Sequence, residues 1–125
     1  MSVQDQMPVR VLVVDDSEVF RNALFALVAA TPGFQAVGLA SSGREALHLI
    51  DALDVQFVLL DLQMPDIDGI ETALRIRRHH PDVVVLLLTA TSRAALRTSL
   101  LTVEDKRELS AEWLTDYWRR HSRSR

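Results

Sequence analysis

The chain has 125 residues, of which 48% are hydrophobic, so it is long and apolar enough for one domain with a single core and excludes wholesale disorder. Its formal net charge of −3 argues against a protein held to nucleic acid by bulk charge, and we expect no direct DNA binding. The lack of cysteine excludes disulfides, thiolate metal sites and cysteine nucleophiles.

Both ends of the chain are expected to lie outside the folded domain. The polar N-terminus contains no basic segment followed by an apolar one, so we expect no signal peptide and a flexible segment at 1–8. One domain is expected at 9–120, followed by a basic tail at 121–125. Every apolar run is far shorter than a membrane span, so we expect no membrane contact and a cytoplasmic location.

Four apolar segments, three of them rich in β-branched residues, alternate with helical patterns along the first ninety residues. Strands are predicted at 9–14, 35–40, 55–60 and 83–88. This regular order of strand and helix, with short connections, is typical of a doubly wound α/β fold with a parallel sheet.

Three helices are predicted between these strands. The first begins at the possible N-cap 16–17 and ends near Ala30, the second opens at 41–43, and the third runs from Ile70 to a stop at 79–81. On the first helix, apolar residues recur at the spacing of an amphipathic helix: Val19, Phe20, Ala23, Leu24, Leu27 and Val28.

The pattern weakens after Thr89. A short helix is predicted at 90–98, a fifth strand at 99–103 and a final helix at 104–120. Apolar residues at helical spacing on the final helix favour core packing, with an aromatic binding stripe as the alternative: Leu109, Trp113, Leu114, Tyr117 and Trp118.

Oxygen-bearing side chains stand at the ends of three predicted strands. Asp15 and Asp16 follow the first strand, Asp61 follows the third and Thr89 follows the fourth. Parallel strands bring these ends to one edge of a sheet, where open α/β sheets bind their ligands. Three carboxylates crowded at that edge repel one another unless a cation is present, so the pattern predicts a divalent metal.

Three motifs occur in order at these strand ends: Asp15–Asp16–Ser17, the loop 61–69 with the sequence DLQMPDIDG, and Thr89–Ala90. Together they resemble the receiver domain of bacterial two-component response regulators, and the resemblance is close over roughly 9–90. It implies a five-stranded, flavodoxin-like sheet of order 2-1-3-4-5, with the fourth helix and fifth strand shortened or rearranged here. Within the loop, Gly69 would provide the turn.

The resemblance implies a role for each matching residue. Asp61 would attack the phosphoryl group of a phosphohistidine on a sensor histidine kinase or phosphotransfer protein and become an aspartyl phosphate. The side chains of Asp16 and Asp61 and the backbone carbonyl of Gln63 would bind Mg²⁺, and Asp15 would act mainly through a metal-bound water. Thr89 would bond a phosphoryl oxygen and shift inward after phosphorylation.

The lysine of the family's site is the part of the pattern that this chain matches least. The only lysine, Lys106, follows Thr89 by 17 residues, a shorter spacing than the family usually has. A strand at 99–103 would put Val103 at the lysine position and Lys106 in the following turn. Either Lys106 reaches the site on its long stem, or it is a solvated residue of the last helix and the site lacks its cation.

Three functions compete on these residues. The favoured one is a receiver that accepts a phosphoryl group and signals through protein–protein contacts, a regulatory domain and not an enzyme. The alternatives are a phosphorylation-independent adaptor or dimerisation module and, less favoured, a phosphohydrolase with a nucleophilic aspartate. Gln63 argues against the phosphohydrolase, which would carry an aspartate there. A shortened helix after Thr89 would expose a strand edge, which predicts a homodimer through the C-terminal third.

Overall fold

The computed structural model describes residues 7–64, 66–90 and 103–122. Within these ranges, five strands form one parallel sheet in the order β2-β1-β3-β4-β5. The strands are β1 (Val9–Val14), β2 (Phe34–Ala40), β3 (Phe57–Asp61), β4 (Val84–Thr89) and β5 (Val103–Asp105). The predicted doubly wound sheet and its 2-1-3-4-5 order are confirmed.

Four α-helices in the described residues connect or follow the strands. They are α1 (Glu18–Ala30), α2 (Gly43–Ala52), α3 (Gly69–His79) and α4 (Ala111–His121), and a short 3-10 helix, η3 (Lys106–Glu108), follows β5. Each α-helix begins after a residue whose side-chain oxygen accepts a hydrogen bond from the backbone N–H three residues on, which satisfies one free donor of the first turn. These N-caps are Ser17, Ser42, Asp68 and Ser110.

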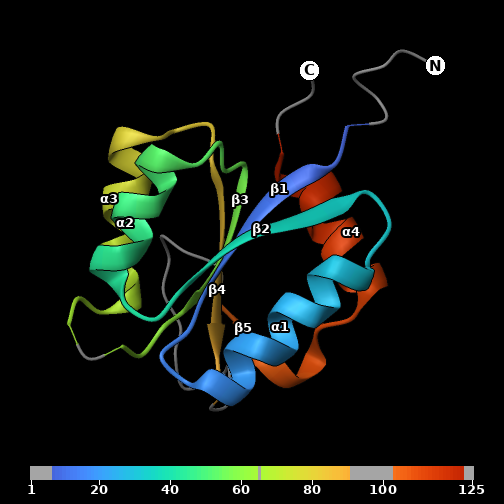
Figure 1. Cartoon of the computed structure of the whole chain (residues 1–125), viewed down its shortest axis with the longest axis horizontal. Coiled ribbons are helices and arrows are strands. Elements are labelled where there is room, and N and C mark those ends of the chain that lie inside the picture. The colour runs from blue at the N-terminus through green and yellow to red at the C-terminus, as the bar shows by residue number, and fades with distance from the viewer. Residues whose placement is uncertain (1–6, 65, 91–102, 123–125) are drawn as a thin grey trace.

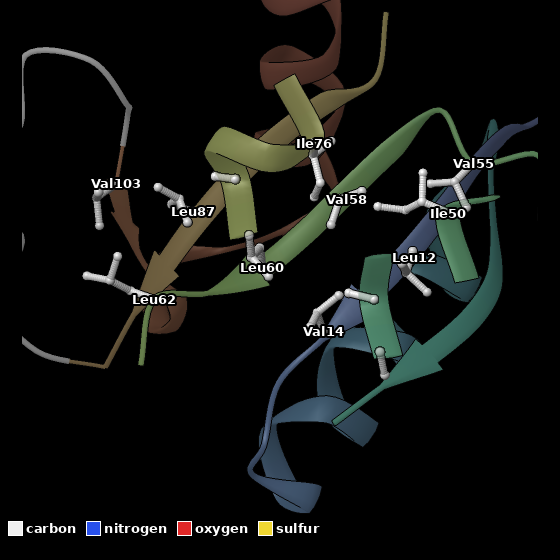
Figure 2. Close-up of a cluster of buried hydrophobic side chains, with 13 residues drawn as sticks. Leu12, Val14, Ile50, Val55, Val58, Leu60, Leu62, Ile76, Leu87 and Val103 are labelled. Atoms are coloured by element: carbon white, nitrogen blue, oxygen red, sulfur yellow. The ribbon is translucent and has the colours of Figure 1, made fainter. Parts of the chain in front are cut away.

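The sheet separates two hydrophobic cores. Helices α2 and α3 cover one face, and α1 and α4 cover the other (Figure 1). Because side chains alternate along a strand, Leu12 and Val14 face the first core while Val11 and Val13 face the second. Figure 2 shows the first core, in which side chains of β1, β3 and β4 meet those of α2 and α3. Burial on both faces explains the continuous apolar runs of the strands.

The aromatic residues of α4 pack in the second core. Tyr117 stacks on Phe57 of β3 with ring centroids 6.0 Å apart, and Trp118 lies 5.4 Å from the same ring. The Tyr117 hydroxyl donates to the carbonyl of Val85 at 3.3 Å. Burial, with a smaller effect of Glu104, raises the pKa of Tyr117 to about 12. The predicted core role of this stripe is confirmed.

The C-terminal elements differ from their predicted bounds. The final helix begins at Ala111 and not at 104, because Ser110 caps it and accepts from the N–H of Trp113 at 3.1 Å. The end predicted for the fifth strand at 103 is also wrong: β5 covers Val103–Asp105, pairs with β4 and leads directly into η3. A mixed apolar and acidic segment of three residues has too little periodicity to be recognised from sequence.

Several predictions fall on residues that the structure does not describe. The helix predicted at 90–98 and the first part of the predicted fifth strand lie almost wholly within 91–102, and the homodimer through this region stays a prediction. Residues 1–6 and 123–125, in the predicted N-terminal segment and basic tail, also lie outside the described ranges.

Candidate functional site

Three carboxylates meet at the carboxyl ends of β1 and β3. The two strands pair in parallel, so Asp15 and Asp16, which follow β1, lie beside Asp61, the last residue of β3. One oxygen from each carboxylate lies within 4.8 Å of the others. Asp15 and Asp61 are buried, with exposed fractions of 0% and 5%, whereas Asp16 is exposed. The predicted acidic cluster is therefore present and is partly shielded from water.

Lys106 lies against this cluster. Its Nζ donates to Oδ2 of Asp15 at 2.7 Å and lies 3.5 Å from Oδ1 of Asp61, and its side chain is 4% exposed. Because β5 ends at Asp105, Lys106 directly follows the strand instead of lying a turn further on. The alternative of a solvated Lys106 in the last helix is wrong.

The surroundings of Asp61 act on its pKa in opposite directions. Burial raises the pKa of Asp61 and the neighbouring Asp15 carboxylate adds to it, while Lys106 and the N–H of Gln63 oppose the shift; the pKa lies at about 7. Repulsion between the crowded carboxylates therefore favours the binding of a cation.

The residues present fit a hard divalent cation. Carboxylate and carbonyl oxygens are the ligands that Mg²⁺ prefers, and in the described part of the chain the cluster brings three carboxylates together against the single ammonium of Lys106. Asp16 is exposed and lies on the open side of the cluster, so its carboxylate is available to an ion arriving from solvent.

Thr89 and Gln63 lie where the sequence predicts them in the fold. Thr89 is the buried last residue of β4 and pairs in register with Asp105 of β5, next to Lys106. Gln63 is exposed, and its backbone N–H lies 3.4 Å from Oδ1 of Asp61. The carbonyl ligand role of Gln63 and the phosphoryl contact of Thr89 stay predictions.

Gly69 fits tightly against the end of β3. Its N–H donates to the carbonyl of Leu62 at 2.8 Å. A Cβ atom at this position would lie 2.4 Å from the carbonyl oxygen of Asp61 and 2.6 Å from Cα of Leu62, distances that real Cβ atoms essentially never show. Glycine is needed here for this close backbone approach, whereas the sequence pattern predicted only that Gly69 provides a turn.

The contacts that the start of α1 makes with the site were not predicted from the sequence. Phe20 places its ring 4.1 Å from Nζ of Lys106, measured to the ring centroid. The N–H of Ser17 donates to Oδ1 of Asp15 at 2.9 Å, and Nη1 of Arg21 donates to the carbonyl of Asp15 at 2.9 Å. The apolar spacing of α1 indicated core packing for Phe20, and no signal in the sequence connects it with Lys106.

The described residues include no helix that is long and apolar enough to cross a bilayer.

Comparison with known proteins places these features in one family. Residues 11–110 match the family model of the response regulator receiver domain. The response regulator GacA of Pseudomonas viridiflava is 39% identical over 93 residues, which are 74% of this chain and 44% of that protein. A protein-glutamate methylesterase/protein-glutamine glutaminase of Anaeromyxobacter dehalogenans is 42% identical over 88 residues, 70% of this chain and 26% of that protein. The chain thus spans less than half the length of these relatives.

A solved structure supports the same assignment. The response regulator TrrA of Thermotoga maritima, determined in complex with Mg²⁺ and BeF, superposes with a TM-score of 0.74 at 29% identity, covering 90% of this chain and 97% of that chain. The family match extends over most of the chain, including both strand-end aspartate motifs and Lys106. This chain belongs to the family of response regulator receiver domains.

Proposed function

We propose that the chain accepts a phosphoryl group on Asp61 from a phosphohistidine of a sensor histidine kinase or phosphotransfer protein in the cytoplasm. The observation that carries this proposal is the buried ammonium of Lys106, which bridges the carboxylates of Asp15 and Asp61 at 2.7 and 3.5 Å. A buried cation beside a carboxylate nucleophile is what a transferring phosphoryl group requires, because its negative charge spreads over three oxygens.

The transfer step can be written with these residues. A carboxylate oxygen of Asp61 forms a bond to phosphorus while the bond from phosphorus to the imidazole nitrogen breaks. The electron pair of that bond stays on the imidazole nitrogen, and the product is an aspartyl phosphate. The Lys106 ammonium, which has three N–H donors, then directs one of them to a phosphoryl oxygen while Asp15 holds another.

The remaining groups of the site have supporting roles in this proposal. The hydroxyl of Thr89 donates to a phosphoryl oxygen and moves inward with it. Asp16, Asp61 and the carbonyl of Gln63 hold Mg²⁺, which when bound supplies positive charge next to the phosphoryl oxygens. The Mg²⁺ and BeF complex of the related TrrA supports this part of the proposal.

The output in this proposal is a protein–protein contact that changes on phosphorylation. The described chain is a regulatory module, and the enzyme activities in the names of the methylesterase relatives belong to proteins of which it matches about a quarter. A phosphorylation-independent adaptor or dimerisation module would keep the acidic cluster for metal binding or for structure. A phosphohydrolase would need its second aspartate at position 63, where this chain has an exposed amide, Gln63.

Incubation with acetyl phosphate and Mg²⁺ tests the proposal. Intact-protein mass spectrometry should show one added phosphoryl group in the wild type and none in Asp61→Asn, while the exposed control Asp82→Asn behaves as wild type. Lys106→Met should slow the labelling by about 100-fold, the usual cost of removing one group that stabilises transition-state charge. Labelling of Asp61→Asn would overturn Asp61 as the phosphoacceptor, and a wild type that binds no beryllofluoride with Mg²⁺ would favour the adaptor instead.

A further inference from the structure

The ammonium of Lys106 is surrounded by groups from three different elements. Asp15 follows β1 and Asp61 ends β3, and both supply carboxylate oxygens to it. The third neighbour is the aromatic ring of Phe20, on the first turn of α1, whose centroid lies 4.1 Å from Nζ. An ammonium over an aromatic face at this distance is attracted by the negative charge of the ring's π-system, and more strongly when water is excluded.

The elements that carry Lys106 do little to fix its side chain. Strand β5 has three residues and η3 has three, and Lys106 is the first residue after the strand. Its partners are distant in sequence, and Asp15 precedes it by 91 residues. A lysine side chain has many rotamers, so groups outside its own element must select the one that points into the site.

Phe20, in contrast, lies on a segment whose backbone is held by several hydrogen bonds. Its backbone N–H donates to Oγ of the N-cap Ser17 at 3.4 Å, and Ser17 in turn donates to Oδ1 of Asp15 at 2.9 Å. Arg21 adds a bond to the Asp15 carbonyl at 2.9 Å. The Asp15 carboxylate and the Phe20 ring therefore belong to one local framework, and both contact the same ammonium.

We propose that Phe20 is a positioning residue of the phosphotransfer site, which holds the Lys106 ammonium against Asp15 and Asp61 through its ring face. This inference rests on the proposed function and adds a residue to it. An aromatic face suits the task because it attracts the ammonium without competing as a strong hydrogen-bond acceptor. An N–H donor of Lys106 thus stays free to turn from Asp61 to an oxygen of the arriving phosphoryl group.

The contact can be observed without metal or phosphate because Lys106 is the only lysine in the chain. Protein labelled with [¹³Cε]-lysine gives one lysine signal, and the ring current of Phe20 should shift its ε-methylene protons upfield. Phe20→Leu should return these protons toward the position of free lysine, and Phe20→Tyr should keep them upfield. Phe25→Leu, the same substitution further along α1, is the matched control and should leave the signal in place.

The role in phosphotransfer is tested by the rate of labelling with acetyl phosphate. Phe20→Leu should slow it by about 3- to 10-fold, the range expected for loss of one partly desolvated cation–π contact, and Phe20→Tyr should restore it. In a Lys106→Met background, Phe20→Leu should have no further effect, because Phe20 acts only through Lys106. A general loss of packing would slow both backgrounds equally.

The outcomes separate the two proposals. An unchanged lysine signal in Phe20→Leu, or an equal loss of rate in the Lys106→Met background, would overturn the positioning role while leaving phosphorylation of Asp61 intact. A folded wild type that takes up no phosphoryl group would overturn the proposed function, and the lysine signal would still show that the contact with Phe20 exists.

Discussion

At the scale of single residues, the site depends on close approach as much as on charge. Asp61 ends β3, and the loop after it returns so tightly that Gly69 touches the backbone of Asp61 and Leu62. The carboxylate that we propose as phosphoacceptor is therefore held by a backbone contact that tolerates no side chain. A methyl group at Gly69 must push the loop away from the strand, because its neighbours are backbone atoms and cannot rotate aside.

Gly69→Ala should destabilise the protein by about 1–3 kcal/mol, the usual cost of forcing an extra methyl group into a packed region. It should also slow phosphorylation of Asp61 because the loop displaces the carboxylate. Urea unfolding and acetyl phosphate labelling measure the two effects. Gly38→Ala is the matched control, since a Cβ there would meet only the side-chain ends of Leu53 and Leu12, and it should change the labelling rate little.

The sequence predicted the acidic residues of the site and missed its aromatic one, for physical reasons. Asp15 and Asp16 follow the apolar strand β1, and Asp61 ends the apolar strand β3; the ends of such apolar runs can be recognised in the sequence. Phe20 occupies an apolar position of an amphipathic helix, which is compatible with core packing or with a cation contact. The choice between them depends on Lys106, whose position depends on a tertiary contact that no local pattern records.

At the scale of elements, the loop after β3 is also joined to helix α2. Both carboxylate oxygens of Asp66 accept from the helix N-terminus, Oδ1 from the N–H of Gly43 at 3.1 Å and Oδ2 from the N–H of Arg44 at 3.0 Å. Burial alone raises the pKa of Asp66, but the backbone N–H groups of Arg44, Ile67 and Gly43 outweigh it, so the pKa lies below its ordinary value. The carboxylate also suits the positive end of the helix dipole.

Asp66→Asn should lower the free energy of unfolding at pH 7 by about 1 kcal/mol, because the amide nitrogen that replaces one carboxylate oxygen cannot accept from a backbone N–H. Because the folded state lowers the pKa of Asp66, its contribution is complete above the ordinary aspartate pKa and is lost as the pH falls through the lower folded value. Urea unfolding at pH 7 and at the most acidic pH where both proteins fold should show the difference closing under acid. A pH-independent difference would contradict this assignment.

The elements also show where sequence reasoning ends. The first four strands are apolar runs, and the first three helices have apolar residues at helical spacing and begin at N-caps such as Ser17 and Ser42. Their order and type were therefore predictable. Strand β5 is short and contains Glu104 and Asp105, which do not suggest a buried strand. Its pairing with Leu87 to Thr89 sets its register, and this pairing is a property of the sheet.

At the scale of the whole molecule, the crowded carboxylates connect stability with ion binding. Burying Asp15 and Asp61 side by side has an electrostatic cost that Lys106 offsets only in part, as the raised pKa of Asp61 indicates. The free energy of unfolding is therefore lower without a bound cation than it would be with the repulsion between Asp15 and Asp61 relieved. Any ion that binds the folded state alone stabilises it by mass action.

Mg²⁺ should raise the unfolding temperature of the wild type, with a gain of about 2.7 kcal/mol at a hundredfold excess over the dissociation constant. Asp61→Asn should melt higher than the wild type without Mg²⁺, because one buried charge is gone, and should gain less when Mg²⁺ is added. Thermal unfolding followed by circular dichroism measures both, with Asp82→Asn as a control. A full Mg²⁺ response in Asp61→Asn would contradict the predicted ligand set.

The packing of α4 gives the protein an internal optical probe. Both of its tryptophans, Trp113 and Trp118, lie on this one helix, and Trp118 contacts Phe57 at the start of the strand that ends on Asp61. Indole emission depends on the polarity of its surroundings, so the fluorescence of the unlabelled chain reports on the docking of α4 alone. Events at Asp61 that loosen or tighten the packing of this helix will therefore change the wavelength or intensity of tryptophan emission, in real time and without any added dye.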